Sequence, residues 1–167
     1  TKNKSKLGAN AILAVSLAGA RALAVERGIP LYASLKEETK QKPALPIPFC
    51  NVINGGKHAG GSLKFQEFMI APIKAKSFAQ ATQWVSETYH VLKELLEKKY
   101  GKAAVNVGDE GGFAPPIKDA KEALVILEKA IKDAGYNKKI AIAIDAAASE
   151  FYNMKSKAYS IPEIITS

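Results

Sequence analysis

Two adjacent acids in a glycine-rich turn are the residues of this sequence best placed for chemistry. Asp109 and Glu110 lie in the run 108–115, with glycines on both sides of them and two prolines after them. Glycine allows unusual turns and proline fixes its own backbone angle, so these flanks favour acids held in one direction. Carboxylates in a closed site can keep a proton or bind a hard cation. A solvated acidic turn on the surface is the alternative interpretation.

Two further carboxylates belong to expected strands. Glu67 follows Gln66 in the run 65–71, where side chains alternate between two faces. Glu67 therefore points either to water, the usual fate of a strand glutamate, or into a pocket flanked by Gln66. Asp145 ends an apolar run, at the position where α/β proteins and barrels place ligand-binding groups. Capping of the segment that follows is an equally good interpretation of Asp145.

A glycine-rich loop carries one of the two histidines. The run 54–61 reads Asn-Gly-Gly-Lys-His-Ala-Gly-Gly and includes His58. So many glycines let the backbone approach a ligand closely and adopt positive φ. Glycine loops are common, however, and an exposed His58 on a turn between two strands is the simpler interpretation of this loop alone.

Helices and strands must position these segments. Apolar residues at helical spacing, followed by glycine or proline, predict helices, and short β-prone runs between turn residues predict strands. The expected elements are helices 7–27 and 31–37, strands 46–53 and 65–71, helices 78–99 and 119–134, a strand 139–146 and a hairpin at 151–160. The polar, proline-containing stretch 38–45 is the predicted domain boundary.

The composition is that of an ordinary globular protein. Hydrophobic residues make up 47% of the 167 residues and charged residues 24%, which excludes a disordered tail. Cys50 is the single cysteine, so a disulfide within the chain is impossible and a reduced, cytoplasmic setting is the simplest interpretation. We expect no signal peptide in this sequence. Polar residues interrupt the first apolar stretch, and we expect no membrane span, since a bilayer needs roughly 20 nearly uninterrupted apolar residues.

The net charge of +8 raises the question of nucleic acid. Lysines of the expected helices alternate with acids, for example Lys93 with Glu94 and Lys129 with Glu128. This pattern is typical of solvated helix faces with local ion pairs. A nucleic-acid-binding module, which needs a basic stripe with stacking aromatic residues, is therefore a poor alternative. The charge favours small anionic ligands over cationic ones.

Taken together, the four segments resemble enolase. The runs 54–61, 66–72, 108–115 and 145–151 occur in enolase order and at enolase-like separations, and 108–115 is the most specific of them. The run 7–16, Leu-Gly-Ala-Asn-Ala-Ile-Leu-Ala-Val-Ser, is similar to the last long helix of the enolase N-terminal domain. The resemblance covers nearly the whole chain.

The resemblance implies an α/β fold in two parts. Residues 1–44 would be the C-terminal helices of the α+β enolase N-terminal domain, and residues 45–167 the first part, ββααβ, of the enolase-type (β/α)8 barrel. A complete barrel takes about 250 residues. An incomplete barrel leaves a sheet edge exposed, so we expect this segment to need a partner or further sequence for stability.

The implied activity is that of a carbon–oxygen lyase. Enolases dehydrate 2-phosphoglycerate reversibly to phosphoenolpyruvate in glycolysis and gluconeogenesis, with Mg²⁺ stabilising the carbanion intermediate. By the resemblance, Asp145 is the first carboxylate ligand of the magnesium and Glu110 the acid that protonates the leaving hydroxyl. Glu67 lies beside Glu110 and, with Gln66, in the substrate site. His58 contacts the substrate from a closing loop.

Other parts of an enolase site are expected outside this sequence. The resemblance places the remaining magnesium carboxylates, the base lysine and the phosphate-binding residues further along the chain. We therefore expect this fragment alone to be inactive. The alternative is a truncated, non-catalytic enolase-like protein that binds another molecule. Enolases generally associate, so a homo-oligomer, a dimer or larger, is implied for the complete protein.

Overall fold

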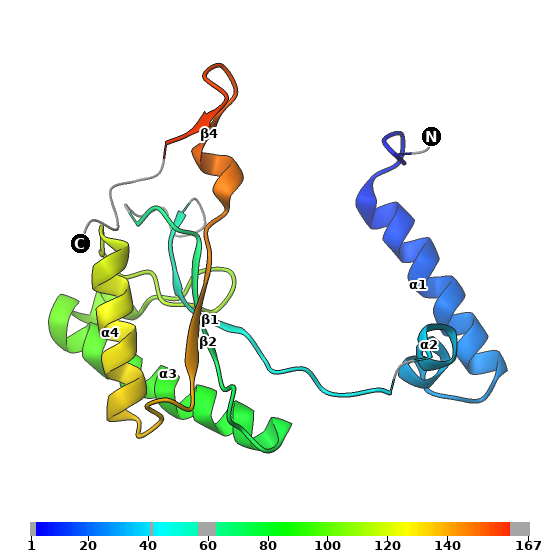
Figure 1. Cartoon of the computed structure of the whole chain (residues 1–167), viewed down its shortest axis with the longest axis horizontal. Coiled ribbons are helices and arrows are strands. Elements are labelled where there is room, and N and C mark those ends of the chain that lie inside the picture. The colour runs from blue at the N-terminus through cyan, green and yellow to red at the C-terminus, as the bar shows by residue number, and fades with distance from the viewer. Residues whose placement is uncertain (1–2, 41, 57–62, 161–167) are drawn as a thin grey trace. The chain divides into compact units, whose positions relative to one another are not determined.

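The computed structural model describes residues 3–40, 42–56 and 63–160, with only the backbone described at 37–39. The chain divides into two compact units, Thr1–Leu45 and Pro46–Ser167. Figure 1 shows the helices and strands of each unit.

The first unit holds two helices, α1 (Ala9–Glu26) and α2 (Leu31–Thr39). Gly28, at φ +63°, ends α1, and the Gly28 and Ile29 amides donate to the Val25 and Ala24 carbonyls. This pair of bonds is the glycine-dependent C-terminal motif that the sequence favours there. Pro30, with extended backbone, is the N-cap residue of α2. Both predicted helices are confirmed.

The surface of α1 is mostly apolar and exposed. Ala24 is its single buried residue, whereas Val15 and Val25 are 74% and 80% exposed. Within the described part of the chain, α1 is the one helix that is long and apolar enough to cross a membrane, with a mean hydropathy of 1.3. Core helices of soluble proteins and signal sequences meet the same test, so this finding is weak evidence for a membrane span.

The second unit is built on a three-stranded sheet in the order β1 (Cys50–Asn54), β2 (Glu67–Ala71), β3 (Ala141–Asp145). The β2 strand is antiparallel to both neighbours. The C-terminal ends of β1 and β3 therefore lie beside the N-terminal end of β2. This arrangement brings Asn54, Glu67 and Asp145 to one end of the sheet.

One face of the sheet is covered by α3 (Phe78–Tyr100) and α4 (Ala120–Asp133) (Figure 1). Phe68 and Ile70 of β2 are fully buried in this layer, together with Leu92 of α3 and Leu127 of α4. Glu67 and Met69 alternate with them on the opposite face and are half-buried. The glutamate of β2 is thus turned away from the apolar core.

Side-chain caps begin both helices, and a glycine ends the first of them. The Ser77 hydroxyl accepts from the Gln80 amide at the start of α3, and the Asp119 carboxylate accepts from the Lys121 amide at the start of α4. Gly101, at φ +84°, ends α3. Such caps satisfy backbone groups that a helix end leaves unpaired.

Shorter elements complete the second unit. A 3₁₀ turn, η2 (Lys102–Val105), follows α3. After β3, a second 3₁₀ turn, η3 (Ala148–Phe151), leads to the predicted hairpin, which is formed by β4 (Tyr152–Asn153) and β5 (Ala158–Tyr159). The Phe151 ring lies 5.6 Å from that of Phe65, which joins the base of the hairpin to the segment before β2.

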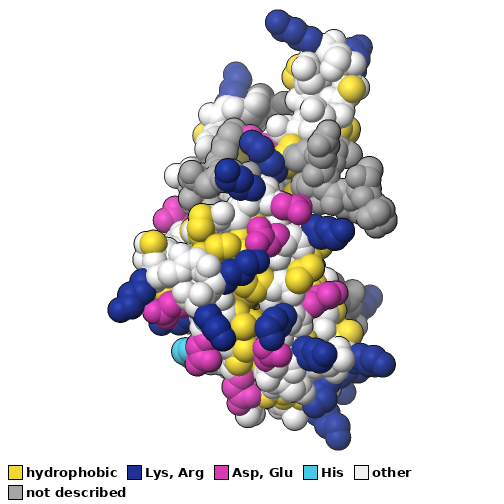
Figure 2. All heavy atoms as spheres, turned by 90° about the vertical axis from the view of Figure 1, so that its left-hand side faces the viewer, with side chains coloured by type: hydrophobic (Ala, Val, Ile, Leu, Met, Phe, Trp, Pro, Cys, Tyr) yellow, Lys and Arg dark blue, Asp and Glu magenta, His cyan; other side chains and the backbone are white. Residues whose placement is uncertain are grey.

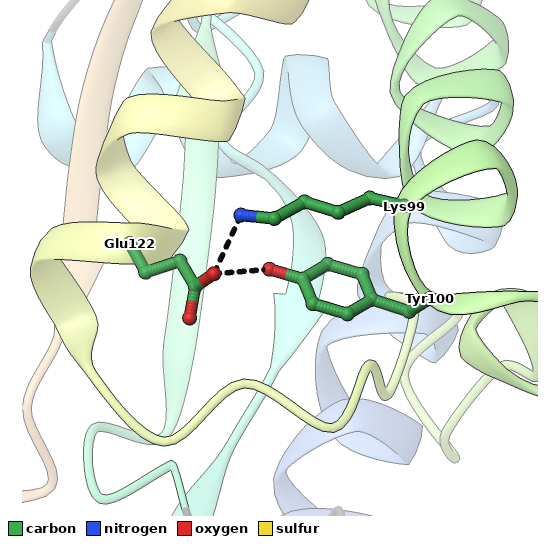
Figure 3. Close-up of polar contacts among 3 residues, drawn as sticks. All are labelled: Lys99, Tyr100 and Glu122. Atoms are coloured by element: carbon green, nitrogen blue, oxygen red, sulfur yellow. Dashed lines mark hydrogen bonds and ion pairs between the residues drawn. The ribbon is translucent and has the colours of Figure 1, made fainter.

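The surface over α3 and α4 carries interspersed charges of both signs (Figure 2). Glu122 of α4 accepts from the Lys99 ammonium at 2.5 Å and from the Tyr100 hydroxyl at 2.6 Å, both on α3 (Figure 3). Lys129 pairs with Asp133 one turn along α4, at 2.6 Å. This is the solvated face that the alternating lysines and acids predict.

Candidate active site

The candidate site begins with a row of polar side chains across the end of the sheet. Glu67, the first residue of β2, is the register partner of Asn54 on β1 and of Asp145 on β3. Side chains of directly paired residues lie on the same face of an antiparallel sheet. The row is therefore held on the face that α3 and α4 do not cover.

The glycine-rich turn brings Glu110 to this row. The Phe113 amide donates to the Val52 carbonyl and the Asn54 amide donates to the Phe113 carbonyl, which joins the end of the turn to β1. Tyr89 of α3 stacks on Phe113 at 4.3 Å and donates to the Gly111 carbonyl at 2.7 Å. These contacts fix the turn from both sides.

Two glycines of this turn are required by close approach. A Cβ atom on Gly108 would lie 2.1 Å from Asn54 Nδ2, and one on Gly112 would lie 2.7 Å from Asn54 Oδ1. Asn54 itself is 1% exposed, so it cannot swing away. The glycines therefore let the turn that carries Glu110 pack directly on the end of β1.

Glu67 and Glu110 form a carboxylate pair. Burial of Glu67, followed by its hydrogen bond with Glu110 and the negative charges of Glu110 and Asp145, raises the pKa of Glu67. A hydrogen bond from Gln66 opposes this shift. Two carboxylates that share a hydrogen bond need a proton between them, so this pair can hold one proton at the end of the sheet.

Asp145 has neighbours consistent with both predicted interpretations. Its Oδ1 accepts from the Ala147 amide at 2.8 Å, which caps the turn that follows, and Gln66 Nε2 lies 3.5 Å from its Oδ2. Its carboxylate is exposed and offers the oxygen ligand that a hard cation prefers. No group of three or more His, Cys, Asp or Glu residues that could hold a metal occurs among the described residues. With its exposed carboxylate, Asp145 can supply one oxygen ligand to a cation, and the other ligands would come from outside the described residues.

The predicted residues Gln66, Glu67, Glu110 and Asp145 thus lie at one end of the sheet, whereas His58 lies outside the described residues. Three residues of the site did not emerge from the sequence: Asn51, Asn54 in its packing role, and Tyr89. Asn51 Nδ2 donates to Glu110 Oε2 at 3.1 Å. A polar residue inside an otherwise apolar strand was the signal that could have identified Asn51.

Comparison with known sequences assigns this chain to a protein family. The profile described as "Enolase, C-terminal TIM barrel domain" matches residues 24–164, and "Enolase, N-terminal domain" matches residues 1–35. The chain belongs to the enolase family. It is an α/β segment that joins the end of the enolase N-terminal domain to the first part of the barrel. Because the two matches overlap, they do not fix the domain boundary.

Curated enolases are similar along almost all of this chain. The enolase of Thermococcus gammatolerans is 57% identical over 163 residues, which is 96% of this chain and 37% of the relative. The enolase of Methanopyrus kandleri is 60% identical over 161 residues, 95% of this chain and again 37% of the relative. The chain therefore spans little more than a third of the length of the curated enolases it matches.

Proposed function

We propose that this chain is the central part of an enolase, a carbon–oxygen lyase that dehydrates 2-phosphoglycerate reversibly to phosphoenolpyruvate in glycolysis and gluconeogenesis. The observation that carries the proposal is the Glu67–Glu110 pair at the end of the sheet where β2 begins, in a chain of the enolase family. A cytoplasmic location and a homo-oligomeric complete protein are part of the same proposal. So is a domain division after residue 44.

The pair supplies what the leaving group needs. Dehydration removes the proton on carbon 2 and the hydroxyl on carbon 3, and that hydroxyl must gain a proton to leave as water. In our proposal Glu110 delivers this proton as the C–O bond breaks, and Glu67, beside it, is the reserve from which Glu110 is reprotonated. A proton donor positioned in this way contributes about 10²–10⁴-fold to a rate.

The other site residues bind and orient. Mg²⁺, when bound, would stabilise the negative charge that builds up on the substrate carboxylate after proton removal. We propose Asp145 as one of its ligands, with Gln66, 3.5 Å away, as a substrate-binding neighbour. His58 is proposed to contact the substrate from the glycine-rich loop. Each of these side chains orients ligands without itself taking part in proton transfer.

A non-catalytic interaction protein is the second candidate, and two observations favour it. Ile144 on the sheet-edge strand β3 is 42% exposed, and α1 presents exposed apolar side chains such as Val15. Both are surfaces that a partner could cover. The remaining part of an enolase barrel would cover them equally well, so the proposal of an enolase segment accounts for them.

Activity measurements separate these candidates. In one sample this chain is assayed alone with 2-phosphoglycerate and Mg²⁺. In another it replaces the matching region of the T. gammatolerans enolase. We expect no phosphoenolpyruvate from the chain alone and clear production from the chimera. An inactive but folded chimera would contradict the catalytic proposal, and turnover by the chain alone would contradict the assignment of the base outside it.

A further inference from the structure

Asn51 is linked to Glu110 by a hydrogen-bond chain whose direction is fixed. The Gly112 carbonyl can only accept, so Asn54 must turn its Nδ2 toward it, at 3.2 Å. Asn54 Oδ1 then faces Asn51 and accepts from Asn51 Nδ2. The same Asn51 amide group donates to Glu110 Oε2 at 3.1 Å. A backbone carbonyl thus determines that Glu110 receives a hydrogen bond here.

A bulge in β1 makes this chain possible. Residues three apart on a regular strand point to opposite faces. The register shifts between Asn51 and Ile53, so Asn51 pairs with Met69 while Asn54 pairs with Glu67. Both asparagines therefore lie on the face that carries the carboxylates. A bulge of this kind re-aims a side chain and is common next to active sites.

Packing alone does not explain these two asparagines. Asn54 is 1% exposed, and Asn51 Oδ1 is buried with no hydrogen-bond partner among the described residues. A buried polar atom without a partner destabilises a fold, and an apolar side chain at position 51 would avoid this cost. The amide group of Asn51 is therefore explained by what it holds, which is the Glu110 carboxylate.

We propose that Asn51 is a positioning residue for dehydration: oriented by Asn54, it holds one oxygen of Glu110 and leaves the carboxylate directed at Glu67 and the leaving group. This inference rests on the proposed enolase function. Without the amide donor, Glu110 is free to rotate, and proton delivery falls although the substrate still binds.

The kinetic test uses the chimera with the T. gammatolerans enolase. Asn51→Leu keeps the approximate size and removes the donor, and we expect kcat to fall about 10–100-fold, since misplacement of a catalytic group by about 1 Å can cost that much. KM for 2-phosphoglycerate should stay within about twofold. Asn51→Asp keeps the shape of the side chain but cannot donate a hydrogen bond when it is ionised, so its kcat should fall as in Asn51→Leu. Asn106→Leu, at an exposed asparagine of the same unit, is the control.

A second measurement does not depend on turnover. In the chimera the side-chain amide NMR signals of Asn51 should shift when Glu110 becomes Gln, and should be unchanged by Asp109→Asn. An active wild-type chimera with unchanged kcat in Asn51→Leu would overturn the positioning role and leave the enolase function standing. An inactive wild-type chimera would overturn the function, and Asn51 signals that ignore Glu110→Gln would overturn the hydrogen-bond chain independently.

Discussion

Glu67 and Glu110, the two glutamates of the site, have different electrostatic surroundings. Glu67 lies in register between Asn54 and Asp145 and is half-buried, so its charged form is disfavoured by burial and by nearby negative charge. Glu110 sits on a turn and receives a hydrogen bond from Asn51. A pair whose environments differ in this way can divide the tasks of storing and delivering a proton.

The role of Glu110 as a proton donor can be tested by replacing its carboxyl group with an amide. In the chimera, Glu110→Gln should reduce phosphoenolpyruvate formation by at least about 10²-fold, the lower end of what a general acid contributes. Magnesium affinity, measured by calorimetry, should be nearly unchanged, because we assign the metal to Asp145. The matched control is Asp109→Asn at the exposed neighbouring acid, which should keep its activity. Wild-type turnover in Glu110→Gln would remove the assignment.

Gly108 tests how tightly the turn packs on β1. In Gly108→Ala the new Cβ would lie 2.1 Å from Asn54 Nδ2, and Asn54 is too buried to move freely. We expect the free energy of unfolding to fall by about 1–3 kcal/mol, as for other overpacked positions. Urea denaturation followed by circular dichroism measures this, and Asp109→Ala in the same turn is the control. Equal midpoints for the two variants would show that the turn can shift at no cost.

At the scale of elements, local signals in the sequence predicted most of the second unit. The helices predicted at 78–99 and 119–134 are present as α3 and α4, because helix ends such as the Ser77 cap and Gly101 depend on neighbouring residues alone. The strand predicted at 46–53 begins later, at Cys50, because Pro46 and Pro48 have no N–H to donate to a ladder. Its bulge and the side-chain directions of Asn51 and Asn54 depend on pairing with β2, which no local pattern encodes.

The contact of Glu122 with α3 predicts a pH dependence. The hydrogen bond from Lys99, and next that from Tyr100, lower the pKa of Glu122 from its ordinary value of 4.5. A lowered pKa means that the folded state holds the proton less tightly than the unfolded state. The stabilisation is therefore present above the ordinary pKa of the unfolded state, and it is lost as pH falls through the lowered pKa of the folded state.

We therefore compare urea midpoints at pH 6 and pH 3, roughly one to two pH units either side of that ordinary pKa. The midpoint of the wild type should fall more on acidification than that of Glu122→Gln, which has no carboxylate to protonate. The effect should be small, since ion pairs at a protein surface stabilise weakly. Glu128→Gln, at an exposed acid of the same helix, should follow the wild type. Parallel behaviour of all three proteins would show that this contact does not stabilise the fold.

For the whole molecule, the sequence motifs identify the family but do not show what completes the site. Glu67, Glu110 and Asp145 are brought together by three strands and one turn within this chain. The described residues nevertheless hold no cluster of three metal-ligating side chains. The predicted substrate contact of His58, on the glycine-rich loop, lies outside the described residues. This remains a prediction.

The exposed edge of β3 should govern how the isolated chain behaves in solution. The strand order β1-β2-β3 leaves β3 at the edge, where Ile144 is 42% exposed, and unpaired edges pair with other chains. We expect this chain to self-associate in sedimentation-velocity experiments, and Ile144→Lys to reduce the association because a charged side chain discourages edge pairing. Leu13→Lys, at a 58% exposed leucine of α1, tests the other apolar surface. Loss of association in Leu13→Lys alone would show that the first unit, and not the sheet edge, is the surface that the rest of an enolase must cover.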